Sequence, residues 1–236
     1  MVPPVYALCY RDKSKREHLT AVSKSIGAPF ILHEGLSSAD PRLRYPEDVR
    51  LARLWSITFG HLDMMRHFLN TSTSDYGIFT EHDILVHRDF RELIEVMVAD
   101  MPKLELDVML LGYLRHPSYR LDPLPLDPSR PLAGTQSGIT YYAYPDNLWG
   151  AQMYMVTKAY AKELLGRFDL DYAVRTTKDD TLTPFNPDWL FTKKGRRACI
   201  QPMLAMEDGL GDYSDEIHGR FHRECYLHNF RAGVYL

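Results

Sequence analysis

The stretch Tyr76-Gly77-Ile78-Phe79-Thr80-Glu81-His82-Asp83-Ile84-Leu85 decides how the fold of this sequence is interpreted. Its apolar centre, flanked by a β-favouring tyrosine and threonine, predicts a buried strand that runs directly into two carboxylates. Residues i and i+2 of an extended segment project to the same side, so we expect Glu81 and Asp83 to point together into one cleft. Open α/β sheets bind their ligands at the carboxyl ends of strands, which is where this pair is expected.

Two chemical roles are open to this acidic pair. Two hard oxygen ligands at a sheet edge suit a Mg²⁺ or Mn²⁺ ion that also binds a diphosphate. The other interpretation is a solvated turn between strand and helix, in which Asp83 or Asp89 caps the helix that follows. Short acidic pairs are common, so the motif by itself does not decide between the two roles.

Composition narrows the class of protein. The chain of 236 residues is 45% hydrophobic, enough to bury the core of a single domain spanning residues 1–236. A net charge of −3 gives no basic field for nucleic acid or an anionic membrane. No apolar run approaches the roughly 20 residues that span a bilayer, and the N-terminus lacks the features of a signal peptide. The three cysteines are too scattered for a disulfide framework or a zinc cluster, so we expect a cytoplasmic location.

The N-terminal residues predict a strand, a helix and a second strand. Residues 5–10 and 29–33 are the strand candidates, and Leu19, Val22 and Ile26 mark the apolar face of the helix between them. Such a crossover implies a parallel sheet, and it directs the basic loop of residues 11–16 to the same edge as the acidic pair. Guanidinium groups match phosphate oxygens, so Arg11 and Arg16 are candidate phosphate ligands; a solvated basic surface is the alternative.

The most regular helical pattern covers residues 47–70 and contains Gly60-His61. A glycine inside a helix costs about 1 kcal/mol relative to alanine, so we expect another segment to approach the helix closely there. His61 could then face a nucleotide or a metal ion. An ordinary, partly buried histidine is the other interpretation.

The second half of the chain alternates regular segments with a long irregular one. Residues 90–102 predict a short helix, 106–112 a buried strand, 149–156 another strand, 158–168 a helix and 198–203 a last strand. Residues 114–147 lack periodicity and are rich in proline and tyrosine, which is typical of a long active-site loop. Its tyrosines suit stacking on a sugar or a base, or packing of the loop itself. Residues 207–236 are expected to form a polar tail that packs over the site.

Two later positions are candidates for a catalytic acid and for a metal ligand. Asp188 lies next to Trp189, as is common for a catalytic or sugar-binding acid, although a helix N-cap fits equally well. One histidine of the tail, His222 ahead of His218, could fold back as a third metal ligand, because imidazole binds Mn²⁺ beside carboxylates. The spacing of the histidines alone makes no metal motif.

Taken together, these segments resemble glycosyltransferase family 25, the LPS and procollagen galactosyltransferase type, in a compact form found in viruses, fungi and bacteria. Tyr10-Arg11-Asp12 with Arg16 resembles the opening element of that family, and Glu81-His82-Asp83 resembles its acidic Glu-Asp-Asp element. Residues 56–61, 150–154 and 187–189 resemble three further elements in the same order. His82 departs from the pattern, since aspartate is commoner there, and this departure leaves the choice of metal open.

The resemblance implies an α/β, GT-A-type, Rossmann-like fold with a mostly parallel central sheet flanked by helices. It implies an enzyme that transfers a hexose, with inversion, from a nucleotide sugar (commonly a UDP-sugar) to a glycan or glycoprotein acceptor, with Mn²⁺ or Mg²⁺. Under this resemblance Asp83, Glu81 and His222 are the metal candidates. Asp188 is the candidate catalytic base, with Glu207 or Asp208 in reserve. The candidate nucleotide-sugar contacts are Tyr10, Arg11, Arg16, His61, Glu81, His82, Trp149 and Gln152.

Two other functions stay open at this level. One is a nucleotide-sugar or sugar-binding module that has lost catalysis, which the histidine at position 82 allows. The other is a metal-dependent phosphoester hydrolase. It ranks last, because the sequence lacks the dense histidine and aspartate set of a two-metal site.

Overall fold

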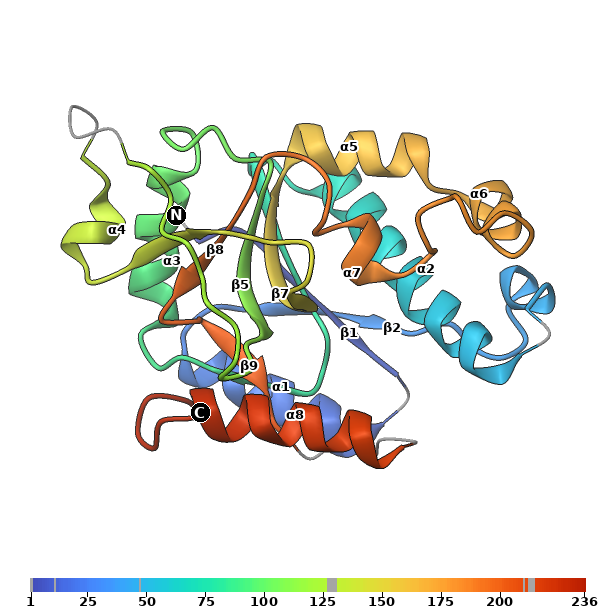
Figure 1. Ribbon diagram of the computed structural model, residues 1–236, viewed down its shortest axis with the longest axis horizontal. Coiled ribbons are helices and arrows are strands. Elements are labelled where there is room, and N and C mark those ends of the chain that lie inside the picture. The colour runs from blue at the N-terminus through green and yellow to red at the C-terminus, as the bar shows by residue number, and fades with distance from the viewer. Residues whose placement is uncertain (1, 11, 47, 127–130, 210, 212–214) are drawn as a thin grey trace.

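The computed structural model describes residues 2–10, 12–46, 48–126, 131–209, 211 and 215–236, and its central feature is a seven-stranded sheet (Figure 1). The strand order is β2-β1-β3-β7-β5-β8-β6. Strands β1, β2 and β3 are parallel, as are β5 and β8, whereas β7 is antiparallel to both of its neighbours and β6 is antiparallel to β8. The expected α/β, Rossmann-like fold with a mostly parallel central sheet is therefore confirmed. The strands are β1 (Val5–Cys9), β2 (Phe30–Glu34), β3 (Tyr76–Thr80), β5 (Val108–Leu114), β6 (Thr140–Ala143), β7 (Trp149–Thr157) and β8 (Arg197–Gln201).

Helices cover both faces of the sheet, and each face has its own apolar core (Figure 1). On one face lie α2 (Val49–Thr71), α5 (Lys158–Arg167), α6 (Leu170–Thr176) and α7 (Pro187–Leu190). On the other lie α1 (Lys13–Ser25) and α3 (Phe90–Asp100). The remaining helices are the 3₁₀ helix η1 (Pro41–Arg44), the short α4 (Ala133–Gln136) and α8 (Glu216–Asn229). Among the described residues, none of the helices combines the length and apolar character needed to cross a lipid bilayer.

Strand β1 shows how the sequence builds the two cores. Tyr6 belongs to the core that includes Trp55 of α2, whereas Val5 and Ala7 belong to the core that includes Leu19 of α1. Successive side chains of a strand point to opposite faces of the sheet, so a wholly apolar strand is what a sheet covered on both faces requires. The N-terminal strand, helix and strand expected from the sequence are confirmed.

A second, two-stranded sheet lies against the carboxyl edge of the first. Strand β4 (Ile84–Val86) pairs antiparallel with β9 (Ala205–Glu207). The N–H of Leu204 donates to the carbonyl of Leu111 at 2.7 Å, which joins β9 to β5. This small sheet carries Glu207 to the end of the large sheet where β3 also ends.

The close approach expected at Gly60 is confirmed. A Cβ placed on Gly60 would lie 2.7 Å from Cδ1 of Leu8 in β1. A tighter contact occurs at Gly112 of β5, where a Cβ would lie 2.6 Å from the main-chain oxygen of Ala205. A leucine side chain can rotate away, but the backbone that begins β9 cannot move without shifting the strand.

Replacing Gly112 with alanine should therefore lower the free energy of unfolding by about 1–3 kcal/mol, as overpacking usually does. Urea denaturation measures the change. The matched control is Gly60→Ala, whose overlap with Leu8 is relieved by side-chain rotation and offset by a gain of about 1 kcal/mol in helix propensity. A Gly112→Ala variant as stable as wild type would contradict the close approach of β9 to β5.

Several elements, most of them short, were not expected from the sequence. Residues 114–147, expected as one long loop, contain α4 and also β6, which forms an edge of the sheet by pairing with β8. The tail from residue 207 contains α8, and α6 also was not expected. Elements of three or four residues, such as β4, β6 and β9, have no local period to detect. They form because tertiary pairing satisfies their backbone groups.

Candidate active site

The candidate active site lies at the carboxyl edge of the large sheet, where β3 ends and β7 begins. Leu114 at the end of β5 pairs with Trp149 at the start of β7, so both flank the same edge as Glu81. The main-chain N–H of Glu81 donates to the carbonyl of Gln152 at 3.3 Å, and the hydroxyl of Thr80 donates to the same carbonyl. These bonds fix the acidic loop after β3 against the first residues of β7.

Four carboxylates from separate segments converge on this edge. Glu81 follows β3, Asp83 precedes β4, Asp188 lies in α7 and Glu207 ends β9. Burial raises the pKa of Glu81 well above its usual value, and the negative charges of the other three raise it further. Arg53 of α2 acts in the opposite direction but with a smaller effect. The group therefore carries a negative charge that its surroundings offset only in part, and a bound cation would stabilise it.

Asp188 is aimed at β7 by the short helix α7. The helix is capped by Asn186, whose side-chain oxygen accepts from the N–H of Asp188 at 2.9 Å. Asp188 thus lies in the first turn, and the helix-cap alternative for this residue is wrong. Its Oδ1 accepts instead from the N–H of Gly150 at 3.1 Å. Burial raises the pKa of Asp188, while the Gly150 hydrogen bond and the charges of Lys193 and His222 lower it.

Glycine is required at position 150 for this contact. Its φ of 122° is in the region that favours glycine, and a Cβ there would lie 2.7 Å from the main-chain nitrogen of Leu114. The side-chain oxygen of Gln152, two residues further along β7, is buried without a hydrogen-bond partner among the described residues. A polar atom buried in this state costs free energy that a bound ligand can recover.

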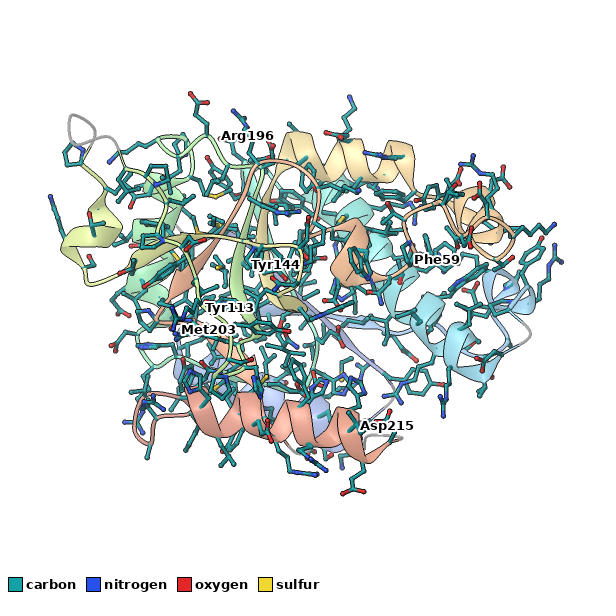
Figure 2. All side chains as sticks on the ribbon, viewed as in Figure 1. Phe59, Tyr113, Tyr144, Arg196, Met203 and Asp215 are labelled. Carbon is teal, nitrogen blue, oxygen red and sulfur yellow. The ribbon has the colours of Figure 1, made fainter. Side chains whose placement is uncertain are left out.

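Helix α8 brings His222 to Glu207 and places His218 beside His222. Nδ1 of His222 lies 2.5 Å from Oε2 of Glu207, and its Nε2 lies 2.8 Å from Nε2 of His218. Asp215, labelled in Figure 2 at the start of α8, accepts from the N–H of His218 at 2.6 Å and fixes the beginning of the helix. Burial raises the pKa of Glu207, and the hydrogen bond with His222 opposes that rise.

His61 lies behind Glu81 and is completely buried. Its Nδ1 is 2.8 Å from the hydroxyl of Tyr154, and its Nε2 is 3.9 Å from Oε1 of Glu81. Burial lowers the pKa of His61 to about 3, so the ring is neutral. A neutral ring that accepts from Tyr154 presents its Nε2 proton toward Glu81. At 3.9 Å the two groups are not hydrogen-bonded, and Nε2 of His61 is buried without a hydrogen-bond partner among the described residues. His61 thus lies in the core behind Glu81, and the expectation that it faces a nucleotide or a metal ion is wrong.

The basic loop after β1 reaches the acidic loop through a lysine. Nζ of Lys15 lies 2.5 Å from Nε2 of His82, whose pKa is lowered mainly by burial. Arg16 instead pairs with Glu34 at 3.6 Å, and Tyr10 is 50% exposed. Arg11 lies outside the described residues. The basic loop expected over residues 11–16 is wrong in its bounds, because α1 begins at Lys13 and both Lys15 and Arg16 lie in its first turns. Lys15 was not among the residues predicted for the site, although it lies in the same basic stretch.

Aromatic side chains border the site. The rings of Trp149 and Trp189 meet edge to face, with centroids 5.2 Å apart, and both are partly exposed. Tyr144 lies near the centre of the molecule in Figure 2, and the ammonium of Lys193 lies 4.2 Å from the centre of its ring. Flat apolar faces beside carboxylates are typical of sugar-binding sites, because sugar rings stack on aromatic rings.

The donor set suits a hard divalent cation but does not enclose one. In the part of the chain that the structure describes, no three histidine, cysteine, aspartate or glutamate side chains form a group that could hold a metal ion. Glu81, Asp83 and His222 are thus not brought together as a ready three-ligand site. Mg²⁺ and Mn²⁺ are often held by one or two carboxylates plus phosphate and water oxygens, and the carboxylates present fit that kind of binding.

The capping alternative for the acidic loop holds for the position of Asp89 but not for a side-chain capping bond. Asp89 occupies the N-cap position of α3 but makes no side-chain capping bond. Asp83 leads into β4, and its carbonyl accepts from the N–H of Asp208 at 2.9 Å. The side chain of Asp83 is therefore not committed to starting a helix.

Comparisons with known proteins find distant similarity of structure and no similarity of sequence. No family model matches the sequence, and no curated protein matches it. A glycosyltransferase involved in the glycosylation of the major capsid of PBCV-1 has 9% identity and a TM-score of 0.43 over 89% of this chain and 96% of its own. A197 from STIV has 11% identity and a TM-score of 0.41, over 84% and 81% respectively. The glycosyltransferase GlyE of Streptococcus pneumoniae TIGR4 has 10% identity and a TM-score of 0.44, over 96% and 61%. Similarity this distant leaves the function to be argued from the side chains.

Proposed function

We propose that this protein is an inverting, metal-dependent glycosyltransferase of the family 25 type. It would transfer a hexose from a nucleotide sugar, a UDP-sugar in the first instance, to a glycan or glycoprotein acceptor. The observation that carries the proposal is the convergence of four carboxylates from separate segments at the carboxyl edge of the sheet, where burial and then the charges of the other three raise the pKa of Glu81. The binding of a cation and a diphosphate would explain why several carboxylates gather at this edge of the sheet.

Asp83 is the proposed direct metal ligand, with Glu81 binding the metal through water or contacting the ribose. The bound cation would offset the charge that builds up on the departing diphosphate. His222 is the proposed C-terminal ligand. Its two ring nitrogens now contact Glu207 and His218, so one of these contacts would have to be released for His222 to bind a metal.

The diphosphate would also be held from the β1 side of the site. Lys15 is tied to the acidic loop through His82, and Arg16 lies one residue further along α1. Both belong to the first turns of a helix whose N-terminal N–H groups favour anions. Tyr10, the residue after β1, belongs to the proposed set on this side, and Arg11 is proposed from the sequence alone because it lies outside the described residues. Trp149 and Gln152 would border the sugar on the β7 side.

Asp188 is the proposed base. In an inverting reaction a carboxylate takes the proton of the acceptor hydroxyl while that oxygen attacks the sugar carbon opposite the leaving group. The pKa of Asp188 is raised by burial, which makes it a stronger base than an exposed aspartate. Its hydrogen bond from Gly150 holds the carboxylate in place during the proton transfer.

A panel of UDP-sugars, each tested with Mn²⁺, with Mg²⁺ and with a chelator, tests the function. We expect slow release of UDP from one donor with metal present and none with the chelator, because glycosyltransferases hydrolyse their donor when no acceptor is bound. Stabilisation by UDP without any turnover would instead indicate a binding module. Cleavage of simple phosphodiesters without donor specificity would indicate a hydrolase.

A further inference from the structure

A cavity outside the candidate active site is not used by the mechanism above. Its volume is about 330 Å³, and it is bordered by the end of β8, the residue after β5 and the C-terminal end of the chain. The lining residues on which the argument depends are Arg115, Gln201, His228, Asn229 and Arg231. We call it the cationic cavity.

The cationic cavity is lined by positively charged side chains, and no carboxylate side chain of the described residues lines it. Arg115, Arg231 and two histidines line it. Among the described residues neither arginine forms an ion pair with a carboxylate. The pKa of His228 is lowered by burial and then by the positive charges of Arg115 and Arg231. Like charges held this close are stabilised by an anion.

Arg115 is held in position by its neighbours. The side-chain oxygen of Gln201 accepts from Nη1 of Arg115 at 3.3 Å, and the side-chain nitrogen of Gln201 donates to the hydroxyl of Tyr113 at 2.6 Å. Asn229 of α8 donates to the main-chain oxygen of Arg115 at 2.7 Å. Nε of Arg115 is nevertheless buried without a hydrogen-bond partner among the described residues. A fixed guanidinium with an unused buried donor is ready to bind an oxyanion.

The cationic cavity is close to the proposed base and metal ligands. Helix α8 contacts Glu207 through His222 and borders the cavity through His228, six residues later. At 1.5 Å per residue these positions are about 9 Å apart along the helix axis. Met203 lines the cavity, and Glu207 lies four residues further along the same segment. One molecule of the size of a short oligosaccharide would reach from the cavity to the carboxylates.

We propose that the cationic cavity binds an anionic group, a phosphate or a carboxylate, carried by the acceptor, so that the acceptor is an acidic glycan. This inference rests on the proposed function, because an acceptor exists only if the protein is a transferase. Binding of the anionic group itself does not depend on catalysis, so it is measured separately.

The first experiment measures binding without a donor. Isothermal titration of the protein with glucose 6-phosphate, with inorganic phosphate and with glucose should give binding for the two phosphates and none for glucose. The double variant Arg115→Gln/Arg231→Gln should weaken phosphate binding at least about tenfold. Arg231→Gln alone should weaken it as well. This variant should fold like the wild type, because Arg231 is exposed and, within the described part of the chain, its side chain hydrogen-bonds to the main chain of residues 228 and 230.

The matched control is Arg223→Gln, an exposed arginine of the same helix that does not line the cavity. It should leave phosphate binding unchanged. Equal phosphate affinity in wild type and the double variant would overturn the cavity as an anion site. The proposed function would not be affected by that result. It is tested independently by measuring the metal-dependent binding of UDP on the same samples.

The second experiment measures transfer. Competing phosphorylated and neutral acceptor sugars should be used unequally by wild type, with the phosphorylated one preferred. In the double variant the KM for the phosphorylated acceptor should rise at least about tenfold, while hydrolysis of the donor in the absence of acceptor stays at the wild-type rate. Equal use of both acceptors by wild type would overturn the acceptor assignment, even where phosphate binds.

Discussion

Replacing Asp188 with asparagine should lower the rate of sugar transfer by about 10²–10⁴-fold, the usual contribution of a general base. Asparagine keeps the oxygen that accepts from the N–H of Gly150, so the geometry of α7 against β7 should be retained. What it loses is the ability to take a proton. Affinity for UDP should change little, because Asp188 is not proposed to contact the diphosphate. Single-turnover kinetics with the preferred donor, beside UDP titration, separates the two effects.

The control for this variant is Asp180→Asn, an exposed aspartate between α6 and α7. It should transfer sugar at the wild-type rate. Glu207→Gln and Asp208→Asn test the reserve candidates, which lie at and just after the end of β9. If Asp188→Asn keeps full activity and Glu207→Gln loses it, the base is Glu207 and the assignment of Asp188 is wrong.

Replacing Asp83 with asparagine should lower transfer by at least about 100-fold, since even the loss of groups that only support a metal ligand costs 10–100-fold in metal affinity or activity. The amide is a neutral and weaker ligand for a hard cation. Glu81→Gln should have a smaller effect, because Glu81 is proposed to act through water or the ribose. Activity measured over a range of Mn²⁺ concentrations reveals whether excess metal rescues each variant.

The control here is Asp89→Asn. Asp89 follows the same acidic loop and makes no side-chain capping bond with α3, so its replacement should leave both stability and transfer unchanged. Full activity of Asp83→Asn at low Mn²⁺ would remove Asp83 from the metal site.

The sequence predicted the parts of the fold that have a local pattern. Strands β1, β3 and β5 are apolar runs, and α2 follows a helical period over many turns, so both kinds of element can be detected within one segment. The close approach at Gly60 was predicted from the cost of a glycine in a helix. Strands β4, β6 and β9 could not be predicted, because three or four residues show no period and their pairing is decided by distant segments.

The sequence predicted which carboxylates are available at the candidate site but not the contacts that hold them in place. Glu81 and Asp83 were singled out because residues i and i+2 share one side of an extended backbone, but β3 ends at Thr80 and the chain bends at residues 82 and 83 before β4 begins. The fixing of Asp188 by Gly150, and of Glu207 by His222, depends on segments far apart in the sequence. Lys15 was overlooked because the guanidinium groups beside it fit phosphate better. Its contact with His82, an unexpected residue at that position, becomes visible only when β1 and β3 are neighbours.

The central claim is that a divalent cation joins Asp83 to the diphosphate of the donor. Isothermal titration of UDP into wild type and Asp83→Asn, each with Mn²⁺ and with a chelator, tests it most directly. The account predicts tight binding by wild type with Mn²⁺, and weak binding in the other three titrations. Equal affinity of wild type and variant in the presence of Mn²⁺ would contradict it.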